Sequence, residues 1–205
     1  MSATGPRRRR GRRTARPRGA ARRDALLDAV IRIVADVGAD AVTHRKVAET
    51  ADLPLASTTY WFESKEQLLT AALERAADGD ILRLKAFVSG AGDGVADPIA
   101  LAVDAILDPI DDSGQATRCS LLATYALLLE AARRPVLRAV TRRWTDAYLE
   151  TLGELLGLAG SHDPEADAAL LLAAADGLLV EQLATGEGPD LRGQLRRLAA
   201  ALIRP

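Results

Sequence analysis

The stretch from Thr43 to Lys65 constrains the fold most, because it has the pattern of two short helices joined by a tight break. Thr43 is suited to cap the first helix, which we expect to end near Thr50. Pro54 cannot continue that helix, because it lacks an N–H group and restricts the residue before it, yet proline is well tolerated in the first turn of a new one. We therefore expect a second short helix that ends near Trp61. The apolar positions of the first helix are Val47, Ala48 and Ala51.

Two short helices in this arrangement predict a helix-turn-helix, whose second helix enters the major groove of DNA. Ala48 is small enough to let the helices approach, and the second helix carries short polar side chains followed by aromatic rings. The candidate DNA-contacting residues are Thr43, Arg45, Leu55, Ala56, Ser57, Thr58, Thr59, Tyr60, Trp61 and Lys65.

The chemistry of these side chains suggests different roles. The hydroxyls at 57–59 can bond to bases or phosphates, while Leu55 and Ala56 offer apolar contact to thymine methyls. Tyr60 and Trp61 carry donors suited to phosphate oxygens, although both could instead be core aromatics, as we expect for Phe62. Arg45 could bind a guanine or pair with an acid.

The same region resembles the tetracycline-repressor (TetR) family of bacterial transcriptional regulators. In that family the positions matching Tyr60, Trp61 and Lys65 contact phosphates, and the resemblance also implies a dimer. The sequence departs from the family pattern at Asp52, where a glycine is usual, and at Pro54, where a serine or threonine is common. Both fit the expected turn, since Asp tolerates left-handed backbone. The resemblance rests on Thr43, Val47, Ala48, Ala51, Leu53, Thr58 or Thr59, Tyr60-Trp61-Phe62 and 64–69.

Charge is distributed very unevenly along the chain. Residues 1–23 carry ten arginines and no acid, whereas residues 24–205 carry 17 basic and 28 acidic residues, a difference of −11. We expect a disordered Arg-rich arm over 1–20, because arginine, glycine and proline bury too little surface to offset the entropy of ordering. DNA binding is then confined to the arm and the helix-turn-helix.

The chain is expected to be all-α, because alanine and leucine dominate and aromatic residues make up only 3%. Apolar periodicity with proline and glycine breaks predicts further helices over 22–37, 64–87, 97–107, 116–133, 136–158, 165–185 and 191–203. We divide the chain into the arm, a DNA-binding unit over 21–80 with its motif at 43–62, and a C-terminal lobe for ligand binding and dimerisation over 81–205.

The lobe has two features that suggest partners. The helix over 165–185 is apolar nearly all round and needs cover, which predicts a homodimer and hence an inverted-repeat DNA site. Polar groups among apolar helices suggest a pocket for a small, largely apolar effector, although each of them could equally be core. The candidate interface residues are Leu137, Val140, Leu152, Ala169, Ala173 and Gly177. The candidate pocket residues are Cys119, Thr124, Tyr125, Trp144 and Tyr148.

Other classes of protein are disfavoured. The two histidines, His44 and His162, lie in no metal-binding or catalytic motif, so we expect no enzyme, cofactor or metal site. Uncharged runs are too short to span a membrane, which predicts a cytoplasmic protein without a membrane partner. The sequence thus predicts a transcriptional regulator, most simply a repressor released by its effector. A ligand-independent regulator and a helical protein-interaction module are the alternatives.

Overall fold

The computed structural model describes residues 15–92, 94–108, 115–186 and 190–203, and every regular element within these ranges is helical. The all-α prediction is therefore confirmed. The elements are α1 (Ala15–Val37), the 3₁₀ helix η1 (Ala39–Ala41), α2 (His44–Thr50), α3 (Leu55–Trp61), α4 (Lys65–Gly90), α5 (Pro98–Leu107), α6 (Gln115–Arg133), α7 (Pro135–Leu158), α8 (Pro164–Thr185) and α9 (Leu191–Leu202).

Local signals in the sequence set most helix ends. The Thr43 side chain accepts a hydrogen bond from the N–H of Lys46 at 3.1 Å, so the predicted cap of α2 is confirmed. The Ser64 side chain accepts one from the N–H of Gln67 at 3.2 Å and caps α4 in the same way. The Gln67 side chain also accepts from the N–H of Glu63 at 2.7 Å. This reciprocal bonding begins α4 immediately after α3.

The prediction of a disordered arm was wrong over residues 15–20, because α1 begins at Ala15 instead of Arg22. Arginine and alanine are both strong helix formers, and Pro17 lies in the first turn, where its missing N–H costs nothing. Residues 1–14 of the arm lie outside the described part of the chain. The first helix therefore carries arginines of the basic segment on an ordered backbone.

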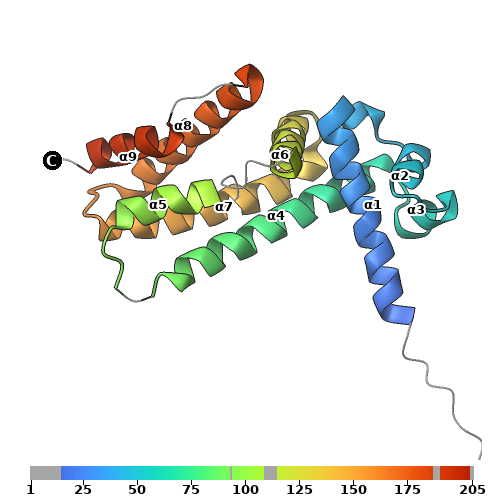
Figure 1. The fold of residues 1–205 in the computed structure, drawn as a ribbon, viewed down its shortest axis with the longest axis horizontal. Coiled ribbons are helices and arrows are strands. Elements are labelled where there is room, and N and C mark those ends of the chain that lie inside the picture. The colour runs from blue at the N-terminus through green and yellow to red at the C-terminus, as the bar shows by residue number, and fades with distance from the viewer. Residues whose placement is uncertain (1–14, 93, 109–114, 187–189, 204–205) are drawn as a thin grey trace, which may run out of the picture.

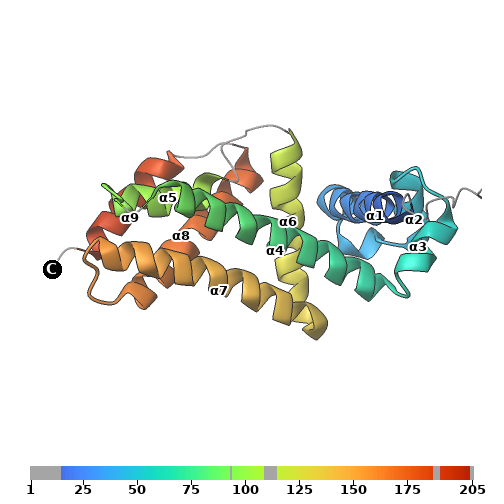
Figure 2. The same cartoon turned by 90° about the horizontal axis from the view of Figure 1, so that it is seen from below.

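The helices form an elongated body with the helix-turn-helix at one end (Figure 1). Helices α4 and α7 run side by side along this body, and α6 passes across them next to α1 (Figure 2). Helices α5 and α9 lie at the far end, where α5 packs against α7 and α9, and α9 packs against α8. Helix α4 is thus continuous from the DNA-binding unit into the C-terminal lobe.

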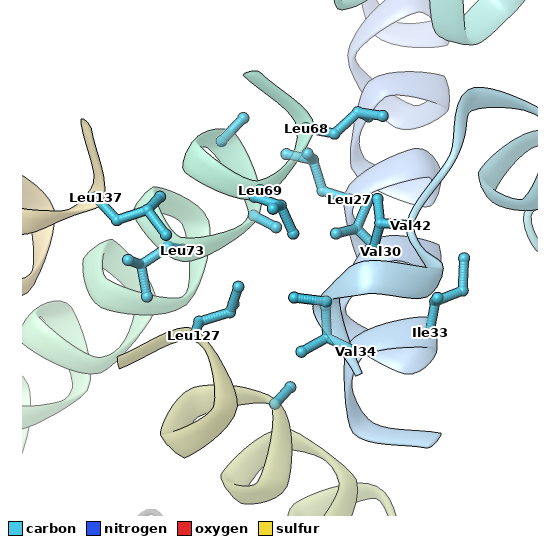
Figure 3. Packing of buried hydrophobic residues seen from close by; sticks show 14 of the residues in the cluster. Leu27, Val30, Ile33, Val34, Val42, Leu68, Leu69, Leu73, Leu127 and Leu137 are labelled. Atoms are coloured by element: carbon cyan, nitrogen blue, oxygen red, sulfur yellow. The ribbon is translucent and has the colours of Figure 1, made fainter. Parts of the chain in front are cut away.

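One hydrophobic core is shared by the DNA-binding unit and helices α6 and α7 of the C-terminal lobe. Side chains of α1 and α4 meet Leu127 of α6 and Leu137 of α7, as Figure 3 shows. Leu27, Val30 and Leu69 are fully buried there. Because α1 packs on α6 across this core, a displacement of α6 would also strain the contacts of α1.

A second core lies among α5, α7, α8 and α9 and includes Leu152, Leu156 and Leu171. Helix α8 is long and apolar enough to cross a membrane by length and composition alone. However, it packs one side against α7 and α9 and contains Asp167, which accepts a 2.6 Å hydrogen bond from Ser161. Its other side is exposed.

Candidate nucleic-acid interface and ligand cavity

The turn between α2 and α3 has the geometry that the sequence predicts. Asp52 has φ 53°, in the left-handed region that aspartate tolerates better than most residues. The next N–H, of Leu53, donates to the carbonyl of Ala48 at 3.0 Å and closes the turn. The prediction for Asp52 is confirmed, and Pro54 directly precedes the first residue of α3.

Thr58 is not available to read DNA, which corrects one of the predicted contacts. Its side chain is fully buried, and its hydroxyl donates to the carbonyl of Leu55 at 2.8 Å. The reason is helical phase: the position lies on the inner side of α3, where this helix packs against α1 and α2. Ser57 is half-buried, and the exposed positions of α3 are Leu55, Ala56, Thr59, Tyr60 and Trp61.

The aromatic residues at the end of α3 differ in their surroundings. Tyr60 is 78% exposed and Trp61 37%. Their rings meet edge to face with centroids 5.0 Å apart, while the Trp61 ring also lies against Gly19 of α1. Phe62 is buried as predicted, beneath the guanidinium of Arg23 at 5.7 Å. Trp61 therefore supports the packing of α1, and Tyr60 is free to contact another molecule.

The two basic residues that are predicted to contact DNA, Arg45 and Lys65, each form an ion pair with an acidic residue of the DNA-binding unit. Arg45 Nε lies 2.8 Å from Oε1 of Glu49, which is the acid-paired alternative of the sequence analysis, and it remains 84% exposed. The Lys65 ammonium donates to the carbonyl of Asp40 at 2.9 Å and is 27% exposed. An ammonium has three donors, so this bond leaves Lys65 with others for a phosphate. Thr43 is also exposed.

A cavity of about 100 Å³ lies among α4, α5, α6, α7 and α8. Thr124, Tyr125, Trp144 and Tyr148, four of the predicted pocket residues, line it together. Cys119 is not among its lining residues, and burial raises the pKa of this thiol. The remaining lining residues are Asp80, Ile106, Leu121, Leu128, Thr145, Leu172, Asp176 and Leu179.

One hydrogen bond joins two polar groups of the cavity. Tyr125 Oη donates to Oδ1 of Asp176 at 3.1 Å. Burial raises the pKa of Tyr125 and of Asp176, although for Asp176 the tyrosine hydrogen bond opposes the effect, and burial raises the pKa of Tyr148 to about 12. Both tyrosines are therefore neutral donors at physiological pH.

The sequence reasoning missed the two acids of this cavity, Asp80 and Asp176. Asp80 follows a helical stripe of apolar residues on α4 and forms an ion pair with Arg83. Asp176 had a detectable signal, because it interrupts an otherwise apolar stretch of α8. An acid at that place in an apolar helix is costly unless it has a partner, and it is therefore informative.

The predicted dimer residues divide into two groups. Leu137, Val140 and Leu152 are buried in the protomer's own cores, so their assignment to an interface was wrong. Their spacing on α7 marks the stripe that faces the interior of the chain itself. Ala169, Ala173 and Gly177 are exposed on α8 together with Leu170 and Val180.

A helix-turn-helix followed by a long connecting helix and a helical lobe with a cavity defines a class of two-part, all-α DNA-binding regulators. Residues 96–205 match the family model described as the tetracyclin repressor-like C-terminal domain. The chain belongs to the TetR family of transcriptional regulators.

Individual relatives agree with this placement. The HTH-type transcriptional regulator BetI of Rhizobium meliloti (strain 1021) is 46% identical over 52 residues, about a quarter of either chain (25% of this one and 26% of BetI). A TetR-family protein of Streptomyces coelicolor A3, SCO1917, is 33% identical with TM-score 0.71, over 90% of this chain and 99% of that one. The multidrug-binding protein EbrR, complexed with malachite green, is 32% identical with TM-score 0.70 over the same shares, 90% and 99%.

Proposed function

We propose that this regulator acts in the cytoplasm as a homodimeric repressor that binds an inverted-repeat operator and leaves it when a small molecule enters the cavity. Helix α4 is the observation that carries the proposal. Its first residue, Lys65, follows α3 within four positions, and further along the same helix Asp80 lines the cavity. A ligand that displaces α4 therefore changes the position of the reading helix.

In this proposal the exposed residues of α3 divide the work of DNA recognition. Ala56 and Ser57 face base edges, with Leu55 and Thr59 beside them. Tyr60 and Lys65 bind phosphates, and Thr43, at the N-terminus of α2, offers its hydroxyl to the backbone. Phosphate contacts fix the position of the helix without reading sequence.

The proposed dimer uses the exposed side of α8. Small residues at 169, 173 and 177 recur at helical spacing and allow close approach by a second copy of the same helix. Leu170 is 55% exposed and Val180 47%, so two large apolar side chains of this helix lie in water in the protomer. A two-fold pairing of these faces would cover both copies at once.

The effector part of the proposal rests on the cavity and on relatives. EbrR, at 32% identity, is described in complexes with ethidium and with malachite green. The aromatic and aliphatic lining here suits a ligand of the same largely apolar kind. To release DNA, the ligand must bind the DNA-free conformation more tightly, with a coupling of about 1 to 3 kcal/mol.

The test is selection of bound duplexes from a random DNA library by the full chain. The proposal predicts an inverted repeat whose half-site centres lie about one helical turn, or 34 Å, apart. Enrichment of a single unrepeated motif, or no enrichment above the starting library, would contradict it. Deep sequencing of successive rounds gives the readout.

A further inference from the structure

The cavity combines aromatic rings with two carboxylates, of which one has no ion-pair partner among the described residues. Tyr125, Trp144 and Tyr148 contribute the rings, while Asp80 and Asp176 contribute carboxylates. Among the described residues, none that lines the cavity is a lysine, arginine or histidine. Such a lining favours a positively charged ligand over a neutral or anionic one of equal size, because burying a charge is favourable only beside an opposite charge.

The two carboxylates are not equivalent. Asp80 forms an ion pair with Arg83, which lies one turn later on α4. The arginine therefore largely compensates the charge of Asp80. Asp176 accepts a hydrogen bond from the Tyr125 hydroxyl, and within the described residues it forms no ion pair. One hydrogen bond leaves most of the acceptor capacity of a carboxylate unused.

Asp176 also lies where a ligand can reach it. The residue is exposed on α8, although neighbouring side chains partly desolvate its carboxylate, and Leu172 and Leu179 of the same helix line the cavity. The volume of about 100 Å³ has room for a compact group of several heavy atoms. The rest of a larger ligand would extend past Asp176 toward the surface.

We infer that the effector is an organic cation, a quaternary or substituted ammonium whose charge lies between Asp176 and the faces of the aromatic rings. The inference rests on the proposed function for its regulatory consequence, but binding itself can be measured without DNA. Aromatic faces attract quaternary ammonium groups, and the carboxylate supplies the neutralising charge. Asp80 is already paired with Arg83, so it contributes less than Asp176 to the attraction of a cation.

The experiment compares choline with 3,3-dimethylbutan-1-ol, which has the same shape but carbon in place of the charged nitrogen, by isothermal titration calorimetry of the full chain. Tetramethylammonium and tetraethylammonium extend the series in size. We expect saturable binding of at least one ammonium compound and about 10- to 100-fold weaker binding of the neutral analogue. Equal binding of the matched pair, or no saturable binding of any ammonium compound, would overturn the inference.

Variants then locate the charge. Asp176→Asn keeps an acceptor for Tyr125 and should remove most of the preference for the cation while leaving the neutral analogue unaffected. Asp78→Asn is the matched control, because Asp78 is a nearby acid of α4 that pairs with Arg143 at 2.8 Å and does not line the cavity. A preference that survives Asp176→Asn, or that Asp78→Asn reduces equally, would contradict the assigned site.

Release of DNA is measured separately, by adding the bound ammonium compound to the complex with a selected duplex. Binding without release would refute the effector role in the proposed function and leave the cation site intact. Release by the neutral analogue as effectively as by the cation would refute the cation site and support the effector role. The two claims therefore fail in distinguishable ways.

Discussion

The guanidinium of Arg134, at the junction of α6 and α7, lies 3.5 Å from Oδ1 of Asp40 in the 3₁₀ helix that precedes the helix-turn-helix. The same guanidinium reaches Glu130 at 2.7 Å and Glu66, on the first turn of α4, at 3.1 Å. Asp40 in turn accepts through its carbonyl from Lys65. One arginine of the C-terminal lobe is therefore tied directly to the DNA-binding unit.

Replacing Arg134 should loosen this connection. Arg134→Met keeps an unbranched apolar stem but leaves Glu130, whose side chain is 14% exposed, with the longer contact to Arg133 at 3.6 Å as its one remaining ion pair among the described residues. Leaving a largely buried carboxylate without its partner should lower the free energy of unfolding by about 1 to 3 kcal/mol. Arg133→Met is the control, since Arg133 is 81% exposed, and should change stability by less than about 0.5 kcal/mol. Equal effects of the two variants in urea unfolding would refute the connection.

Thr58 and Ser57 are neighbours with different expected phenotypes. Thr58→Ala removes a buried hydroxyl and its bond to Leu55 and should lower the unfolding free energy by about 1 kcal/mol, with base preference unchanged. Ser57→Ala should change base preference and leave stability within about 0.5 kcal/mol. Denaturant unfolding and repeated library selection measure the two properties. A Thr58→Ala variant with changed base preference and unchanged stability would instead show that Thr58 contacts bases in the major groove of DNA.

The α8 face should control oligomeric state. Ala173→Arg introduces a long charged side chain into the centre of the proposed interface and should convert dimer to monomer in sedimentation equilibrium. Ala139→Arg makes the same change at an exposed position of α7 and should leave the dimer intact. Dimers that tolerate the first substitution would move the interface elsewhere.

The first 14 residues should supply salt-dependent affinity. Deleting residues 1–14 removes six arginines and leaves α1 whole. Each lost phosphate contact should reduce the slope of log K against log salt by about 0.9 in magnitude. Thermal unfolding should not change. A salt slope equal to that of the full chain would show that these residues make no phosphate contact.

Helix boundaries were predictable from the sequence because their causes are local. Ser64 and Gln67 form the start of α4 from within one turn, and Gly38 ends α1 with its φ of 90°. The early start of α1 does not follow from composition, because a segment rich in arginine and glycine has the pattern of a disordered arm although arginine and alanine have high helix propensity. The short helix η1 was also missed, since three residues carry no periodicity.

Which side of a helix faces the interior was less predictable, because it depends on packing partners that are distant in sequence. Thr58 looked like its neighbours Ser57 and Thr59, and only the packing of α3 on α1 and α2 assigns it to the interior. Leu137 shares its periodicity with any buried stripe, whether the cover comes from α4 and α6 or from another subunit. The cavity acids were missed for a related reason, since Asp80 and Asp176 are almost a hundred positions apart and line one cavity only in the folded chain.

The central claim is that two copies of α3 read DNA together, and it is tested most directly by affinity for a selected duplex whose half-sites are scrambled one at a time. At fixed salt and temperature, scrambling both halves should weaken binding by about 10³-fold or more, and scrambling either half should lose a large part of that. Affinities within about threefold for the intact, half-scrambled and fully scrambled duplexes would contradict sequence-specific recognition by this helix-turn-helix.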